Sequence, residues 1–162
     1  MKETQENLQM QRVQALQRLH RERTEEALWE CLLTFQDFEF HTYSGLPYSY
    51  HMKYGRSGTY TKELWIDRRE KSKSLVWSSV RTAYQKVLEL QQESERPVVA
   101  RPKALGDIRG ITYIYGIFYE FALLEMPEKA KEKIFDADRS KKITGKINFH
   151  PMQGLTISYW VI

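Results

Sequence analysis

The first 36 residues show the spacing of apolar positions that is typical of α-helices. Residues 4–36 contain no Gly or Pro, and apolar residues recur at helical intervals except from His20 to Glu26, where none occurs. This pattern predicts a helical arm over residues 1–36 with a joint near Thr24, whose hydroxyl suits a helix cap. The first half of the arm is interpreted either as a projecting, partner-seeking helix or as a solvated extension.

The pattern changes to alternation from Phe38 to Arg68, which indicates β-strands. The sequence GRSG at residues 55–58 supplies a turn between two alternating runs, and SGLP at residues 44–47 sets the entry to the first. We therefore predict a β-hairpin. One face of its first strand carries Tyr48, Tyr50, Met52 and Tyr54, and one face of its second strand carries Tyr60, Leu64 and Ile66, opposite Trp65.

Helical spacing returns twice after the hairpin. Ser74 is predicted to cap a helix that ends near Gln92, and a second helix is predicted over residues 112–124. Gly116 within the second helix indicates close packing against a neighbour, and Pro127 is expected to open a further short helix. The predicted buried stripe of the first helix consists of Val76, Val80, Ala83, Tyr84, Val87 and Leu88.

Alternation at the end of the chain predicts two more strands, at residues 142–149 and 154–162. The last strand is apolar on both faces, so it is expected to be central in a sheet or covered. The whole pattern predicts the α+β class, with an N-terminal helical arm at residues 1–36 and a single α+β domain at residues 37–162. In that domain a central β-hairpin is followed by helices, and a C-terminal β-hairpin joins the sheet.

Composition narrows the class of protein further. Hydrophobic residues make up 41% and aromatic residues 13%, values that describe a folded protein. Cys31 is the only cysteine, which excludes an intramolecular disulfide and a thiolate metal cluster and fits a reducing cytoplasm. The longest apolar segment, residues 111–124, contains Glu120 and is shorter than the roughly 20 residues that span a bilayer. We therefore expect a soluble, cytoplasmic protein without a membrane partner.

Few residues point to catalysis. The four histidines show no metal-ligand spacing, and the sequence has neither a phosphate-binding GxxxxGK[ST] loop nor a GxSxG elbow. Glu63, Asp67, Glu70 and Lys71 lie where a metal-dependent nuclease could place acids and a lysine, but a solvated strand end explains them better. The sequence therefore predicts no catalytic residue, no metal and no cofactor, and an enzyme is the minority hypothesis.

The positive charge of the chain is concentrated in its middle. The net charge is +4, and residues 67–87 alone carry six Lys or Arg against two acids, whereas residues 1–40 carry five against eight. Basic and hydroxyl side chains at the start of a helix could bind phosphate, although they could equally decorate an exposed face. The candidate contacts are Arg68, Arg69, Lys71, Lys73, Ser78 and Arg81.

Aromatic residues of the hairpin form a second candidate set. Tyr54, Tyr60 and Trp65 alternate with basic side chains, a composition that suits stacking on bases or gripping a protein partner. Because one face of the hairpin must cover the core, only two or three rings are expected to be available as anchors.

The segment SLVWSSVRTAYQKVLEL, at residues 74–90, resembles the recognition helix of gluconate-repressor-type winged-helix regulators. This resemblance implies a sequence-specific DNA-binding transcriptional regulator whose helix from Leu75 enters a groove of the duplex. A regulator of that kind is expected to dimerise, here through the helical arm at residues 4–22.

A longer stretch, about residues 38–124, resembles a family of small uncharacterised proteins from mobile elements of gut Firmicutes. The resemblance lies in HTYSGLPYSYHMKYG, ELWIDRREKSKSLVWSSVRTAYQKV and RPKALGDIRGITYIYGIFYEF. It implies a non-catalytic binding protein that acts on nucleic acid or on a nucleoprotein complex such as a CRISPR effector, as anti-CRISPR inhibitors do. This is the leading functional hypothesis, and the DNA-binding regulator is the alternative.

Overall fold

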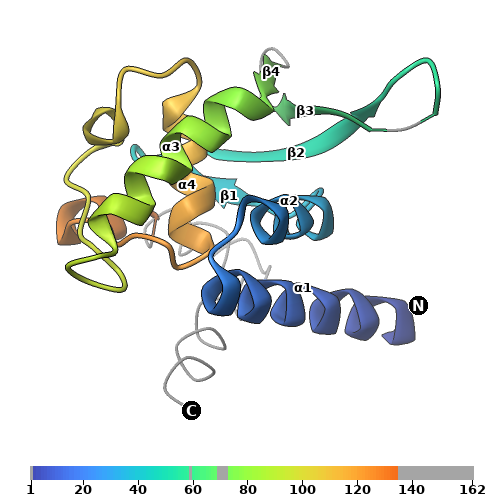
Figure 1. The fold of residues 1–162 in the computed structure, drawn as a ribbon, viewed down its shortest axis with the longest axis horizontal. Helices are drawn as coiled ribbons and strands as arrows, with labels where there is room; N and C mark the ends of the chain where they lie inside the picture. The colour runs from blue at the N-terminus through green and yellow to red at the C-terminus, as the bar shows by residue number, and fades with distance from the viewer. Residues whose placement is uncertain (1, 59, 69–72, 135–162) are drawn as a thin grey trace. The chain divides into compact units, whose positions relative to one another are not determined.

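The computed structural model describes residues 2–58, 60–68 and 73–134, without the side chains of residues 2, 3, 54 and 60. The chain has the α+β architecture that the sequence predicts, with helices and a four-stranded antiparallel sheet (Figure 1). The described residues separate into two compact units, 2–36 and 37–134. No helix in these described ranges has the length and apolar content needed to cross a membrane.

The first unit is a pair of helices, α1 (Lys2–Glu22) and α2 (Glu25–Thr34). The predicted joint near Thr24 is confirmed, because the Thr24 hydroxyl caps α2 by accepting a hydrogen bond from the Ala27 N–H at 3.1 Å. At the other end of α2, Arg12 donates hydrogen bonds to the carbonyl oxygens of Thr34 and Gln36. The Arg12 contacts join α1 to the C-terminal end of α2.

The second unit contains the sheet, whose strands follow one another in the order β1-β2-β3-β4. The predicted hairpin is confirmed as β2 (Pro47–Tyr54) and β3 (Tyr60–Asp67), which pair with Tyr50 opposite Ile66 and Met52 opposite Leu64. These inward residues are buried, whereas Trp65 on the other face is partly exposed. The alternation in the sequence therefore reports the two faces of the hairpin correctly.

One short strand was not predicted. β1 (Phe40–His41) pairs with the start of β2 through a tight turn in which the Thr42 N–H donates to the Leu46 carbonyl oxygen at 2.9 Å. Gly45 in this turn has a φ of 91°, a conformation that favours glycine. The predicted entry at residues 44–47 is thus the turn of a second, shorter hairpin.

The predicted cap at Ser74 is wrong, because Ser74 lies inside strand β4 (Lys73–Val76) and pairs with Trp65. Its hydroxyl donates to the Glu63 carboxylate at 3.0 Å instead of capping a helix. Helix α3 (Trp77–Leu90) begins three residues later, and its N-cap residue Val76 makes no side-chain cap. Val76 is also 43% exposed, so it does not belong to the buried stripe.

Helices α3 and α4 (Ile111–Glu120) pack against each other, with the rings of Tyr84 and Phe118 at 6.2 Å. The close approach expected at Gly116 is confirmed, since a Cβ there would lie 2.5 Å from the Tyr48 hydroxyl and also collide with the His41 carbonyl oxygen. The backbone of α4 therefore lies directly on β1 and β2.

Helix α4 ends four residues before the predicted end at residue 124. Ala122 has a φ of 59°, and the Leu123 N–H donates to the Phe118 carbonyl oxygen at 2.9 Å. This left-handed residue with its backward hydrogen bond is a Schellman cap, which stops a helix. The apolar residues beyond Glu120 are buried in the turn that follows.

The predicted short helix after Pro127 is confirmed, because residues 128–134 are helical. A 3₁₀ helix, η1 (Pro102–Leu105), precedes α4 and packs against both α3 and α4. The two C-terminal strands predicted at residues 142–149 and 154–162 lie outside the described residues.

Candidate nucleic-acid interface

The structure places the predicted aromatic anchor and the predicted basic residues on different faces of the sheet. Trp65 pairs with Ser74 and lies on the outward face, whereas Lys73 pairs with the buried Ile66 on the inward face. Arg68 contacts Tyr113 of α4, which packs near the same inward face. The two candidate sets therefore do not share one face among the described residues. Arg69 and Lys71 lie outside those residues, as do the side chains of Tyr54 and Tyr60.

The side chains on the outward face around Trp65 contact one another. The Lys53 ammonium lies 3.9 Å from the centroid of the Trp65 ring, a cation–π contact. His51 Nδ1 lies 2.8 Å from Asp67 Oδ2, and Glu63 accepts the hydrogen bond from Ser74. Side-chain exposures of 44% for His51 and 43% for Asp67 show that this face reaches solvent.

Arg68 is held at the start of α4. Its Nη1 donates a hydrogen bond of 2.5 Å to the Tyr113 hydroxyl, and its guanidinium carbon lies 5.8 Å from the centre of the same ring. Tyr113 in turn accepts, through its carbonyl oxygen, a 2.5 Å hydrogen bond from Tyr48. Burial raises the pKa of the Tyr48 hydroxyl well above its usual value, so this hydroxyl stays a donor. Arg68 therefore has a positioning contact inside the fold.

The remaining predicted contacts lie on β4 and on the exposed side of α3. Ser78 and Arg81 are exposed on α3, and Lys73 is partly exposed on β4. Because β4 separates Lys73 from the first turn of α3, the predicted basic entry directly into a helix is wrong. The effect of a helix dipole falls off within the first turn. The dipole of α3 therefore does not explain why this segment is basic.

Both carboxylates of β3 are bound by groups other than the predicted cations. Asp67 is paired with His51, and Glu63 accepts from Ser74 and lies 3.5 Å from the Thr61 hydroxyl. Within the part of the chain that the structure describes, Lys73 makes no ion pair. Its positive charge is therefore available to a ligand.

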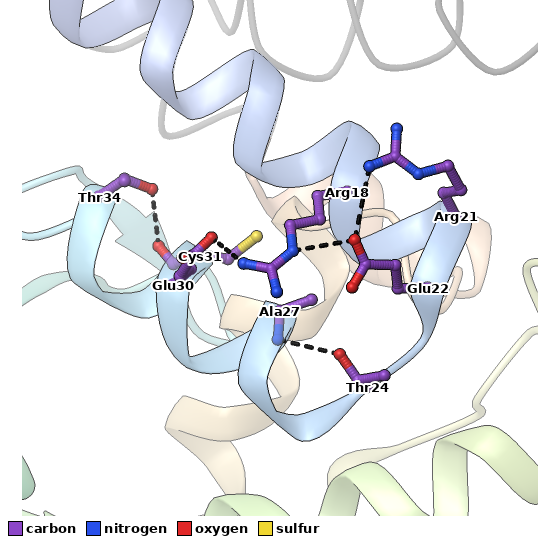
Figure 2. Close-up of polar contacts among 8 residues, drawn as sticks. All are labelled: Arg18, Arg21, Glu22, Thr24, Ala27, Glu30, Cys31 and Thr34. Carbon is purple, nitrogen blue, oxygen red and sulfur yellow. Dashed lines mark hydrogen bonds and ion pairs between the residues drawn. The ribbon is translucent and has the colours of Figure 1, made fainter.

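A network of charged side chains in the first unit is internally paired (Figure 2). Arg18 Nε donates to Glu22 at 3.0 Å, its Nη1 is paired with Glu30, and Arg21 lies 3.4 Å from the same Glu22 carboxylate. The hydrogen bonds to Glu30 and Glu22 raise the pKa of Arg18, and the bond from Arg18 lowers the pKa of Glu22. These charges neutralise one another within the unit.

Cys31 lies beside this network and is fully buried. Desolvation by burial raises the pKa of its thiol, so the thiolate that a nucleophile or metal ligand requires is strongly disfavoured near neutral pH. The thiol packs as a small apolar group in α2.

Of the residues considered for an enzyme, His51 and Asp67 contact each other. His41 is buried in β1, whereas His51, Glu63 and Asp67 lie on the outward face of the sheet and Glu63 is bound to Ser74. Among the described residues, no group of three or more His, Cys, Asp or Glu side chains could hold a metal ion.

Three further exposed cations precede α4 and were not among the predicted contacts. Arg101, Lys103 and Arg109 belong to the exposed segment before α4. The sequence contained a local signal, because residues 101–109 hold three basic residues and a single acid, Asp107. Residues 88–126 as a whole carry four basic and six acidic side chains. A charge summed over that longer segment is negative and does not reveal the basic cluster.

No protein-family model matches the chain, and neither a curated protein nor a solved structure shows significant similarity to it. The resemblance to small proteins of mobile elements therefore stays a prediction from the sequence patterns, as does the winged-helix resemblance. For the second of these, the structure shows that strand β4 directly precedes α3. A helix-turn-helix unit instead requires a helix at that place.

Proposed function

We propose that this chain is a non-catalytic binding protein of a mobile genetic element that acts on nucleic acid or on a nucleoprotein complex. The observation that carries the proposal is the charge distribution at the end of the sheet. Both β3 carboxylates are bound by His51 and Ser74, and Lys73 makes no ion pair in the described part of the chain. Cations that their own protein does not neutralise attract polyanions.

The basic segment between β3 and β4 supplies most of this proposed contact. Arg68, Arg69, Lys71 and Lys73 would neutralise phosphates, and Ser78 and Arg81 would extend the contact along α3. Trp65 lies on the other face of the sheet, beside Lys53, and would meet a protein component of a complex instead of the same nucleic-acid strand. The mobile-element resemblance favours a CRISPR effector as the complex, and inhibition of a host defence nuclease as the outcome.

A triple variant tests the proposal without disturbing the Arg68–Tyr113 contact. Arg69→Gln, Lys71→Gln and Lys73→Gln remove three positive charges from the basic segment. A matched control, Arg21→Gln, Lys86→Gln and Lys129→Gln, removes three exposed charges from three separate helices. Binding to a labelled duplex, a single-stranded DNA and a single-stranded RNA is measured by fluorescence anisotropy over a series of KCl concentrations.

We expect the triple variant to bind more weakly and the control to bind like the wild type. For a duplex, the slope of log K against log salt should become shallower by about 3, since each phosphate contact contributes roughly 0.9. Equal affinity and slope for variant and control would refute a phosphate-binding role of this segment. Capture of purified CRISPR effector by the wild type, with and without nuclease treatment, separates direct protein binding from a nucleic-acid bridge.

A further inference from the structure

We infer that the segment before α4 is a second phosphate-binding surface, in which Arg101, Lys103 and Arg109 contact the sugar–phosphate backbone of a nucleic acid. The inference rests on the proposed function and deepens it, because it extends the contact to residues that belong to a different element. It also selects one partner class, a polymer of phosphates, over an acidic protein.

The position of this segment follows from two contacts of the sheet with the start of α4. Gly110, the N-cap residue of α4, has a φ of 81°, and a Cβ on it would lie 2.5 Å from Leu75 Cδ1 of β4. Arg68 at the end of β3 donates to Tyr113 in the first turn of α4. Arg109 is therefore carried next to the edge strand that holds Lys73.

The rest of the segment lies along the helices. η1 packs against α3 and α4, and Figure 1 shows the chain running back along α3 before α4 begins. Arg101 and Lys103, on either side of Pro102, are exposed here. The cations of this segment, of β4 and of the exposed side of α3 thus lie on neighbouring elements of the same unit.

Like Lys73, the three cations of this segment have no carboxylate partner among the described residues. In the described ranges of the chain, Arg101, Lys103 and Arg109 make no ion pair. By contrast, Arg96 and Lys131 both bind Glu125, at 3.3 Å and 3.0 Å. Asp107, the one acid among residues 101–109, forms no ion pair with these cations in the described residues.

The chemistry of the surface favours nucleic acid over protein. Residues 99–112, all of which the structure describes, expose no large apolar side chain; the exposed Val98 directly precedes them and the exposed Val76 lies on β4. A protein interface needs a buried apolar or aromatic centre, whereas contacts to phosphates come from Arg, Lys and hydroxyl side chains. The exposed side chains of this segment are those of Arg101, Lys103, Asp107, Arg109 and Thr112, together with two alanines.

The test is a variant with Arg101→Gln, Lys103→Gln and Arg109→Gln, compared with the same matched control at residues 21, 86 and 129. Binding of both proteins to a labelled duplex and to a single strand is measured across a KCl series beginning at about 50 mM, where electrostatic contacts are strong. Circular dichroism of the variants checks that the fold is retained. We expect the slope against log salt to become shallower by about 3 for duplex and about 2 for a single strand.

The outcomes separate this inference from the proposed function. If the β3–β4 variant loses affinity and the variant at residues 101–109 does not, the second surface is refuted and the proposed function stands. If wild-type protein binds no nucleic acid but captures purified CRISPR effector after nuclease treatment, the inference is refuted and the protein-binding branch stands. If the variant at residues 101–109 loses affinity for an acidic peptide such as polyglutamate as strongly as for nucleic acid, the surface is not specific for phosphates and the inferred partner class is wrong. Loss in both variants, specific to nucleic acid, supports the inference.

Discussion

The two units of the chain contain sets of cations that differ in their carboxylate partners. In the helical pair, Arg18 is bound by Glu22 and Glu30, and Arg21 lies beside Glu22. In the α+β unit, Lys73, Arg101, Lys103 and Arg109 make no ion pair among the residues that the structure describes. These two sets of cations are expected to act differently, because an ion pair within the protein lowers the attraction of a cation for a polyanion.

The comparison also shows why the α+β unit is suited to present such charges. Gly110 and Gly116 allow the backbone of α4 to lie directly against Leu75 of β4 and His41 of β1. The cations at the start of α4 are consequently fixed by core packing and not by their own salt bridges. Residues 2–36 contain no glycine, so the helical pair has no contact of this kind.

Breaking this packing has the largest expected effect. In Gly116→Val, the side chain would collide with the His41 carbonyl oxygen and the Tyr48 hydroxyl, and neither belongs to a flexible chain end. Overpacking of this kind should lower the free energy of unfolding by about 3 kcal/mol. Urea denaturation followed by circular dichroism measures the change.

The control for Gly116→Val is Thr112→Val, which places the same side chain at an exposed position of α4. It should change stability by less than about 0.5 kcal/mol. Equal destabilisation by the two variants would mean that valine disfavours α4 by its helix propensity, and that the close approach to β1 is not responsible.

A smaller effect is expected from Tyr113→Phe, which removes the hydroxyl that accepts from Arg68. Loss of one hydrogen bond should lower the free energy of unfolding by about 1 kcal/mol. Binding to nucleic acid should fall less than in Arg68→Gln, because the phenylalanine variant keeps the positive charge. Anisotropy titrations of the two variants, at one salt concentration, compare them.

If Tyr113→Phe binds nucleic acid as weakly as Arg68→Gln, Arg68 acts only by holding β3 against α4. A charge-retaining replacement, Arg68→Lys, then distinguishes the two roles. Lysine keeps the charge but cannot reproduce the planar guanidinium, so it should preserve the salt slope while losing part of the stability.

The helices and the hairpin could be predicted because periodicity reports which side of an element is buried. Tyr50, Leu64 and Ile66 alternate in the sequence and are fully buried in the structure. Thr24 marked the joint in the arm because its cap is a local interaction, three residues long. Local patterns of this kind need no knowledge of the remainder of the fold.

The errors arose where a distant partner or an unusual backbone conformation determined the structure. Ser74 looks like a helix cap in sequence, but pairing with Trp65 and the hydrogen bond to Glu63 place it in a strand. β1 has only two residues and exists through its pairing with β2, so its own sequence carries almost no periodic signal. Ala122 ends α4 in a conformation that alanine rarely adopts, which a propensity argument does not predict.

The candidate site shows the same division. The basic segment from Arg68 is visible in the sequence. Its separation from Trp65 depends on which residues of β3 and β4 face the same side of the sheet. The availability of a charge could not be predicted either, because it depends on which carboxylates the fold brings near. Asp67 follows directly on Ile66 and precedes Arg68, yet it is bound to His51 on the neighbouring strand.

The smallest expected effect is the sharpest check on the comparison. Arg18→Gln and Arg109→Gln each remove one positive charge, but Arg18 is bound by two carboxylates and Arg109 by none in the described residues. Arg109→Gln should make the duplex salt slope shallower by about 1, and Arg18→Gln should leave it unchanged. If the two variants shift the slope equally, nucleic acid responds to net charge alone. Internal neutralisation, on which the difference between the two units depends, would then have no role in binding.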